Sequence, residues 1–319
     1  MKLLVTGGAG FIGTNFIKYM FANNPDIFII NVDKLTYASV ANQNEFNDLS
    51  QYTFVKEDIS KQKKIEFIFQ QHQPDIVVNF AAETHVDRSI QNPEPFITSN
   101  IIGTFNILEA ARKNNTYVHQ VSTDEVYGSV EKEQFTEESP YNPRSPYSAT
   151  KASADHLVRA YNITYGLPIT ISTCSNNYGP YQHPEKFIPT AIINALNNKP
   201  IPLYGDGQNV RDWLYVEDHC SAINLIIRKG KKGETYGISS ESEKINKDVL
   251  RIILKELQKE ESLINHVTDR KGHDRRYSFN STKIREQLGW SPKTTFDQGI
   301  QKTIEWYKKN KHLWEKLTT

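Results

Sequence analysis

The sequence predicts an α/β fold in which a doubly wound parallel sheet is joined to a smaller C-terminal lobe. A buried strand-like run, 2–6, leads through a glycine-rich loop into an apolar-periodic helix. Further buried runs alternate with helix-like segments over about the first 180 residues, as parallel strands joined by crossover helices do. After Pro180, prolines and glycines divide the chain into short pieces, which indicates that a different lobe begins there.

The glycine-rich loop is the first informative element. Residues 6–13 read TGGAGFIG, and the helix that follows carries its apolar residues at Phe11, Ile12, Phe16, Ile17 and Met20. Glycine is required where a backbone turns tightly, approaches a diphosphate or lets a helix pack closely on a strand, and we expect these roles for Gly7, Gly10 and Gly13. The helix N-terminus would offer free N–H groups and the positive end of its dipole to phosphate. The loop therefore predicts a Rossmann-type dinucleotide site.

The second strand-like run, 27–32, supports this interpretation and selects the cofactor. It ends at Asp33, twenty residues after Gly13. A carboxylate at that position accepts hydrogen bonds from ribose hydroxyls and repels a 2′-phosphate, so NAD is expected in preference to NADP. Lys34 is the feature that favours NADP. The alternative is a glycine-rich turn beside an incidental surface aspartate.

The remaining strands place polar motifs along one edge of the sheet. Strand-like runs follow at 52–55, 75–79, 117–121 and 169–173. Ligands of doubly wound sheets bind outside the carboxyl ends of the strands. Three of these ends carry polar motifs: Asp58-Ile59, AAETHVDRS (81–89) and STDEVYG (122–128). We expect 214–227 to return to the main sheet as a helix. This gives an NAD-binding domain over 1–180, joined by part of 212–240, and a mainly substrate-binding lobe over 181–319.

Composition excludes several classes of function. The 319 residues include 38 basic and 37 acidic side chains, a net charge of +1, so no basic field points to nucleic acid. Two cysteines, Cys174 and Cys220, suit a reducing cytoplasm, and neither has a metal-ligand neighbour at suitable spacing. The apolar run after Lys2 is too short for a signal peptide, and no apolar stretch approaches the roughly twenty residues that cross a bilayer. We expect a cytoplasmic protein that uses no metal and binds neither nucleic acid nor membrane.

Tyr147 and Lys151 form a candidate catalytic pair. They are four residues apart and share one face of a predicted helix. At roughly 4 Å and an effective dielectric near 20, the ammonium would favour the phenolate by about 4 kcal/mol, or roughly three pKa units. We therefore expect the pKa of Tyr147 to fall toward neutrality, where a phenol serves as a base. By spacing alone, a solvent-facing Tyr and Lys would be the simpler interpretation. Their position after the fifth-strand motif of a dinucleotide fold favours catalysis.

These motifs together resemble the extended short-chain dehydrogenase/reductase family, which carries a GxxGxxG loop and a YxxxK pair with an upstream Ser or Thr. Within that family the chain looks most like the dTDP-glucose 4,6-dehydratases. The motifs that carry this resemblance span nearly the whole chain and are NVDKLTYA (31–38), AAETHVDRS, STDEVYG, NNYGPYQHPEKFIP (176–189), YGDGQNVRDWLYVEDHC (204–220) and DRKGHDRRY (269–277). Related 4-epimerases usually lack an acid pair at the positions of Asp124 and Glu125.

The resemblance implies a reaction with three steps. NAD oxidises carbon 4 of the sugar, water leaves across carbons 5 and 6, and hydride returns to carbon 6, which gives dTDP-4-keto-6-deoxyglucose. Tyr147, supported by Lys151, would take the proton of the 4-hydroxyl, and Thr123 would hydrogen-bond the 4-oxygen. Glu125 would abstract the proton on carbon 5, and protonated Asp124 would donate to the leaving 6-hydroxyl. These roles require environments that push the two carboxyl pKa values apart.

The resemblance also implies the binding residues. The cofactor contacts would be Gly7, Gly10, Phe11, Ile12, Gly13, Asp33, Lys34, Asp58, Ile59, Ala81, Ala82, Ser99, Tyr147, Lys151 and Asn177. The substrate contacts would be Thr84, His85, Thr123, Asn176, Glu185, Lys186, Arg211, Asn246, Arg270, His273 and Tyr277. The guanidinium groups of Arg211 and Arg270 suit a diphosphate. Thr84 stands where the family usually has Ser, and Ser99 where Thr is common.

Two further expectations follow from the resemblance. In this family, helices like 98–112 and 148–161 pair with their copies across a dimer axis, so a homodimer is expected. Two other functions stay open. One is a 4,6-dehydratase or 4-epimerase of a UDP- or GDP-sugar, and the other is a non-catalytic NAD-binding regulator, which would have no need for the acid pair together with Tyr147 and Lys151.

Overall fold

The main sheet of the computed structural model, which describes residues 1–39, 43–46 and 48–317, is wholly parallel. Its order is β10-β6-β5-β4-β1-β2-β3, and each neighbouring pair runs in the same direction. The strands are β1 (Lys2–Thr6), β2 (Phe28–Asp33), β3 (Tyr52–Lys56), β4 (Ile76–Asn79), β5 (Tyr117–Thr123), β6 (Ile169–Cys174) and β10 (Thr235–Ile238). The predicted doubly wound sheet and its first six strands are confirmed. The sequence analysis missed β10, a four-residue strand that contains Gly237.

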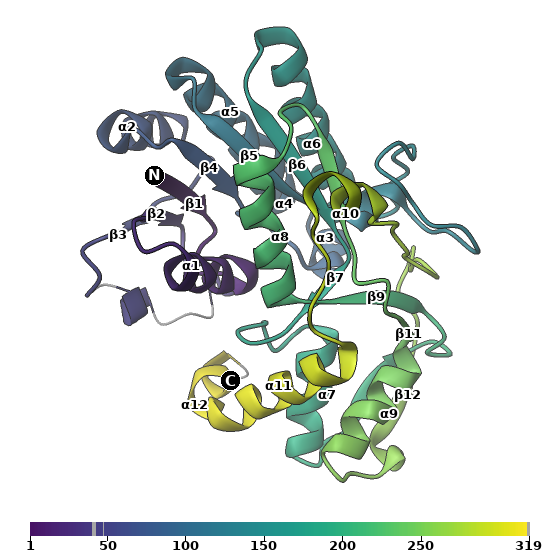
Figure 1. The fold of residues 1–319 in the computed structure, drawn as a ribbon. Helices are drawn as coiled ribbons and strands as arrows, with labels where there is room; N and C mark the ends of the chain where they lie inside the picture. Colours follow the sequence, from purple (N-terminus) through teal and green to yellow (C-terminus); the bar gives the residue numbers. More distant parts are fainter. Residues whose placement is uncertain (40–42, 47, 318–319) are drawn as a thin grey trace.

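Helices cover both faces of this sheet, as Figure 1 shows. One face carries α1 (Phe11–Asn23), α8 (Val216–Lys229) and α10 (Thr282–Leu288), and the other carries α2 (Gln62–His72), α5 (Gly103–Asn114) and α6 (Pro146–Tyr165). Alternation along β1 explains the two layers, because Leu3 and Val5 pack with the first group while Leu4 packs with the second. The expected return of a helix near 214–227 is confirmed by α8, which contributes Cys220 and Ile223 to the core beside β1.

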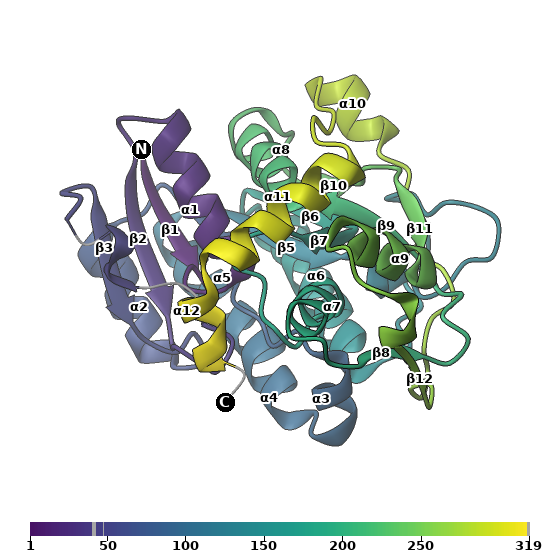
Figure 2. The ribbon, with the colours of Figure 1, turned by 90° about the horizontal axis from the view of Figure 1, so that it is seen from below.

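A second core lies in the C-terminal half (Figure 2). A three-stranded sheet contains β7 (Asn176–Tyr178), β9 (Val210–Tyr215) and β11 (Glu243–Ile245), and a two-stranded sheet contains β8 (Ile201–Tyr204) and β12 (Ile264–Val267). The surrounding helices are α7 (Phe187–Leu196), α9 (Asn246–Glu256), α11 (Phe296–Lys309) and α12 (Lys311–Trp314). Among the residues described, no helix combines the length and the apolar character that crossing a membrane requires.

Short helical segments complete the fold. They are α3 (Val86–Gln91), α4 (Glu94–Phe96), a π-helical turn (Ile97–Ile102) that runs into α5, and four 3₁₀ turns (Gln43–Phe46, Asp124–Tyr127, Glu261–Leu263 and Glu315–Leu317). The turn Asp124–Tyr127 directly follows β5, so it holds the predicted acid pair at the edge of the sheet.

A buried histidine in the main sheet makes stability depend on pH. His119 of β5 is fully buried, and its two ring nitrogens hydrogen-bond the hydroxyls of Thr170 (2.8 Å) and Ser172 (3.0 Å) on β6. Burial, assisted by the nearby His219 and Lys232, lowers the pKa of His119 to about 3. The unfolded chain therefore binds a proton more readily than the folded one between about pH 6.5 and pH 3, and the stability from this site is lost as pH falls through that window.

We predict that His119→Gln removes this pH dependence. Although the variant is less stable at pH 7, the difference in free energy of unfolding between it and the native protein should shrink by about 2 kcal/mol at pH 5. Urea unfolding of both proteins at the two pH values measures the difference, and other titrating groups cancel in the comparison. If the difference in free energy of unfolding between the two proteins is the same at pH 7 and pH 5, His119 is not buried in its neutral form.

Candidate active site

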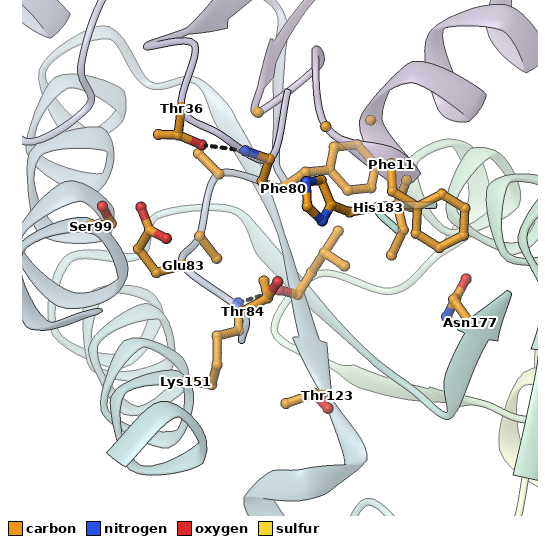
Figure 3. A pocket seen from close by; sticks show the side chains of 18 of the residues that line it. Phe11, Thr36, Phe80, Glu83, Thr84, Ser99, Thr123, Lys151, Asn177 and His183 are labelled. Atoms are coloured by element: carbon orange, nitrogen blue, oxygen red, sulfur yellow. Dashed lines mark hydrogen bonds between the residues drawn. The ribbon is translucent and has the colours of Figure 1, made fainter. Parts of the chain in front are cut away.

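A cavity of about 300 Å³ lies at the carboxyl ends of the main strands. Its walls are the loops after β1, β2, β4, β5 and β6, which is the edge that the sequence analysis selected. Figure 3 shows Phe11 and Phe80 toward the glycine loop, while Thr123 and Lys151 lie at the other end of the view. The cavity therefore extends from the glycine loop to the predicted catalytic residues.

The glycine loop has the geometry that a dinucleotide requires. Gly7 has a φ of +71°, and a Cβ at Gly13 would lie 2.3 Å from the carbonyl oxygen of Gly7. Gly10 is the N-cap of α1 and makes no side-chain cap bond, so the first N–H groups of the helix are open to an anion. A Cβ added at Gly10 would have one close neighbour, the carbonyl oxygen of Gly7 at 3.3 Å, so the space beside this residue is open. These residues fit the diphosphate of NAD.

Asp33 and Lys34 decide how the adenosine end is held. The Asp33 carboxylate accepts the N–H groups of Ala9 (3.0 Å) and Leu35 (2.8 Å), and burial raises its pKa. Lys34 Nζ donates to Ser99 Oγ (2.9 Å) and lies 3.4 Å from a carboxylate oxygen of Glu83. Because Glu83 already pairs with Lys34, this lysine is a weaker partner for a 2′-phosphate than the sequence suggested. The arrangement favours NAD.

Asp124 and Glu125 occupy different environments although they are adjacent. Asp124 is 1% exposed, and its Oδ2 atom has no hydrogen-bond partner among the described residues. Burial, followed by the charges of Glu125 and Asp212, raises the pKa of Asp124 well above its usual value. Burial also raises the pKa of Glu125, but Arg211 and Lys186 oppose that shift. The pKa of Asp124 is therefore raised more strongly, and Glu125 is the carboxyl that ionises more readily.

Helix α6 presents Tyr147 and Lys151 from its first turns. Its N-cap is Ser145, which forms a capping box with Ser148, so the helix begins at a defined residue. Both predicted catalytic side chains are buried, and Lys151 Nζ donates a 2.7 Å hydrogen bond to the carbonyl oxygen of Val121. The end of β5 thus fixes the position of the ammonium.

The sequence analysis predicted that the pKa of Tyr147 falls toward neutrality, and this prediction is wrong for the chain without a bound cofactor. Burial raises the pKa of this phenol well above its ordinary value, and the negative charge of Glu125 raises it further. A hydrogen bond with Thr123 acts in the opposite direction without offsetting them. The sequence-based estimate counted the attraction of Lys151 and omitted desolvation, which is the larger effect here.

A second cavity of about 300 Å³ joins the first. The residues that line both are Thr84, Glu125, Asn176, Asn177, Gln182, Glu185 and Lys186. Arg211 stacks 4.2 Å over the ring of Tyr277 and Arg270 stacks 4.8 Å over the ring of Tyr204. Asn176 Oδ1, Asn246 Oδ1 and Arg270 Nε are buried there without hydrogen-bond partners among the described residues, which suits a polar ligand.

The structure brings most of the predicted site residues together. Every predicted cofactor contact lines the first cavity except Asp58. The carboxylate of Asp58 instead accepts a hydrogen bond from the backbone N–H of Ser60 (2.8 Å). Every predicted substrate contact lines the second cavity except Thr123, which lies in the first.

Sequence reasoning missed several residues that line these walls. They are Phe80, Glu83, Gln182 and His183 in the first cavity and Asp87, Tyr204, Trp213 and Asp274 in the second. All eight lie in or beside motifs already recognised. Phe80 directly precedes AAETHVDRS, which contains Glu83 and Asp87, while Gln182 and His183 lie in the 176–189 motif, Tyr204 and Trp213 in the 204–220 motif, and Asp274 in the 269–277 motif. Their position in or beside those motifs could have identified them as cavity-lining residues.

Comparison with known proteins agrees with this geometry. Residues 4–303 match the family model for GDP-mannose 4,6 dehydratase. The dTDP-glucose 4,6-dehydratase of Salmonella typhimurium strain LT2 is 48% identical, with 97% of this chain and 93% of that protein aligned.

Solved structures are equally similar. The Bacillus anthracis dTDP-glucose 4,6-dehydratase in complex with NAD superposes with a TM-score of 0.93 at 48% identity, covering 99% of both chains. The Streptomyces venezuelae dTDP-glucose 4,6-dehydratase, also solved with NAD, gives a TM-score of 0.95 at 43% identity, covering 99% of this chain and 100% of the other.

Proposed function

Because the chain belongs to the GDP-mannose 4,6-dehydratase family, we propose that it is an NAD-dependent dTDP-glucose 4,6-dehydratase that forms dTDP-4-keto-6-deoxyglucose. The observation that carries the proposal is the acid pair in its setting. Asp124 lines the first cavity and Glu125 lines both cavities; burial raises the pKa of both carboxyls, and the pKa of Asp124 is raised further than that of Glu125. A pure oxidoreductase or epimerase has no step that requires a protonated acid beside an ionised base.

The cavity with the glycine loop holds the cofactor in this proposal. When bound, NAD accepts hydride from carbon 4, returns it to carbon 6, and adds a positive charge that favours the phenolate of Tyr147. Tyr147 then takes the proton of the 4-hydroxyl, and the ammonium of Lys151 stabilises the charge that remains. Thr123 donates to the 4-oxygen as negative charge develops. Desolvation strengthens each of these interactions because all three side chains are buried.

The acid pair performs the elimination. The 4-ketone acidifies the hydrogen on carbon 5, and the Glu125 carboxylate abstracts it. Lys186 and Arg211 support the ionised form of Glu125 before this step. Asp124 donates its proton to the departing 6-hydroxyl, so that water leaves and a 4-keto-5,6-ene remains. The elimination thus leaves Glu125 protonated and Asp124 ionised. Glu125 returns its proton to carbon 5 as hydride reaches carbon 6, and the proton that Tyr147 took from the 4-hydroxyl balances the one that Asp124 gave to water.

The second cavity holds the nucleotide diphosphate. Arg211 and Arg270 bind its phosphate oxygens, with the predicted substrate contacts around them, and the guanidinium planes are pre-oriented by Tyr277 and Tyr204. We assign cofactor binding to 1–180 with the returning part of 212–240, and substrate binding mainly to 181–319. We also place the protein in the cytoplasm; recovery in a membrane fraction after cell lysis would contradict this.

A homodimer through α5 and α6 completes the proposal. Ile97 (47% exposed), Ile102 (44%) and Phe105 (37%) are apolar side chains on or beside α5 that the single chain leaves partly open to water. Burying such side chains against a second copy is favourable. One of the two helices of this interface, α6, also carries the catalytic pair.

The product assay tests the substrate. We expect incubation with dTDP-glucose to yield a 4-keto sugar, detected by its absorbance in strong base, at a rate at least about tenfold above that with UDP- or GDP-glucose. Preferential turnover of a UDP- or GDP-sugar would establish the alternative dehydratase, and interconversion at carbon 4 without loss of water would establish an epimerase. Retention of NAD with no turnover of any nucleotide sugar would favour the regulator.

The variant Glu125→Gln should separate oxidation from elimination. We expect product formation to fall by at least about a hundredfold while NADH absorbance rises and persists, since the ketone forms but carbon 5 keeps its proton. Tyr147→Phe should instead give no NADH. The exposed Glu131, changed to Gln, is the matched control and should turn over normally. Wild-type turnover by Glu125→Gln would show that another group is the base.

The variant Phe105→Glu should weaken the homodimer. Placing a charge in an apolar contact carries a desolvation penalty of several kcal/mol, so we expect monomers in sedimentation velocity at concentrations where the native protein is dimeric. Phe67→Glu is the control, because Phe67 is 60% exposed and lies on α2, a helix that packs beside α5 but is not part of the proposed interface. A dimer that survives Phe105→Glu and dissociates with Phe67→Glu would move the interface to α2.

A further inference from the structure

Helix α6 carries a third buried ionisable group behind the catalytic pair. Tyr147, Lys151 and Asp155 are spaced by four residues, so they follow one another along one face of the helix at intervals of about 6 Å. All three are buried, and Asp155 has no measurable exposure. Asp155 is absent from the described lining of both cavities, and the mechanism proposed above does not use it.

The carboxylate of Asp155 is held by two hydroxyl groups. Its Oδ2 atom accepts hydrogen bonds from Ser122 Oγ (2.5 Å) and Tyr141 OH (3.0 Å). Arg159 supports the second of these, since its Nη2 donates to Tyr141 OH (2.8 Å) and its guanidinium lies 4.8 Å from the Tyr141 ring centre. A buried carboxylate with this support has a fixed position.

Electrostatics connects Asp155 to Lys151. Burial lowers the pKa of Lys151, and Asp155 is the largest influence that raises it again, followed by Cys174. Conversely, burial raises the pKa of Asp155, and Lys151 is the largest influence that opposes this shift, followed by Ser122, Arg159 and Tyr141. The charged and titratable groups around this pair are therefore Cys174 beside Lys151, and Arg159, Tyr141 and Tyr127 beside Asp155.

We propose that Asp155 is a positioning residue that keeps the Lys151 ammonium charged and directed at Tyr147, acting from the side of Lys151 opposite the phenol. The proposal rests on the roles given above to Tyr147 and Lys151. A buried ammonium without a counter-charge is costly and tends to lose its proton. The carbonyl oxygen of Val121 accepts one hydrogen bond from Lys151 but supplies no full charge.

Removing the charge of Asp155 has two opposite effects on Tyr147. Loss of the Lys151 proton withdraws a cation about 6 Å away along the helix and disfavours the phenolate, while loss of the carboxylate itself removes an anion about 12 Å away and favours it. The nearer effect is the larger.

The test is a titration of Tyr147 in the full chain loaded with NAD. Phenolate absorbance in the ultraviolet is followed against pH, and the same titration of a Tyr147→Phe partner is subtracted to isolate this residue. We expect Asp155→Asn to raise the midpoint by at least about one pH unit. Asp155→Glu retains the carboxylate and should stay within about half a unit of the native midpoint. A merely structural role would change the unfolding temperature of both variants without moving the midpoint.

An unchanged or lowered midpoint in Asp155→Asn, or a native Tyr147 that does not titrate with NAD bound, overturns the proposal. If Asp155→Asn does not fold, Tyr141→Phe removes one hydrogen bond to the carboxylate and should raise the midpoint by a smaller amount; no shift would again overturn it. The titration needs no turnover, so it tests the role of Asp155 even if the protein does not convert dTDP-glucose. Absence of keto-sugar formation by the native enzyme would count against the proposed function alone.

Discussion

Desolvation at the end of β5 and the start of α6 is the constraint on which the rest of the site depends. Thr123, Asp124, Tyr147 and Lys151 are all less than a tenth exposed, so each charged form needs a nearby partner. The structure supplies those partners selectively. Arg211 opposes the raised pKa of both carboxyls and Lys186 adds to this at Glu125, whereas the charges of Glu125 and Asp212 raise the pKa of Asp124 further. Adjacent carboxyls in the chain therefore become chemically different.

The two lobes matter because they bring these partners from distant parts of the sequence. Arg211 comes from β9, and Lys186 precedes α7 in the C-terminal half, while the acid pair belongs to the main sheet. Lys186 Nζ donates to the carbonyl oxygen of Thr84 (2.9 Å), which ties the loop after β4 to the same junction. The environment of the acid pair thus exists only when both lobes are folded against each other.

The same principle extends behind the catalytic helix. Ser122 and Tyr141 hold Asp155, and Asp155 faces Lys151 one turn away from Tyr147. In the proposed arrangement, Asp155 lines neither cavity and acts on the reacting phenol through Lys151.

The sequence by itself determined the elements whose causes are local. The glycine loop, the first six strands and the i, i+4 relation of Tyr147 and Lys151 follow from periodicity and short spacings. The motifs that line both cavities followed from the resemblance to a known family. Tertiary structure decided the place of the short strand β10, the pairing of Lys34 with Glu83, and the direction of the Tyr147 pKa. These depend on burial and on charges contributed by residues far away in the chain, and a local pattern contains neither quantity.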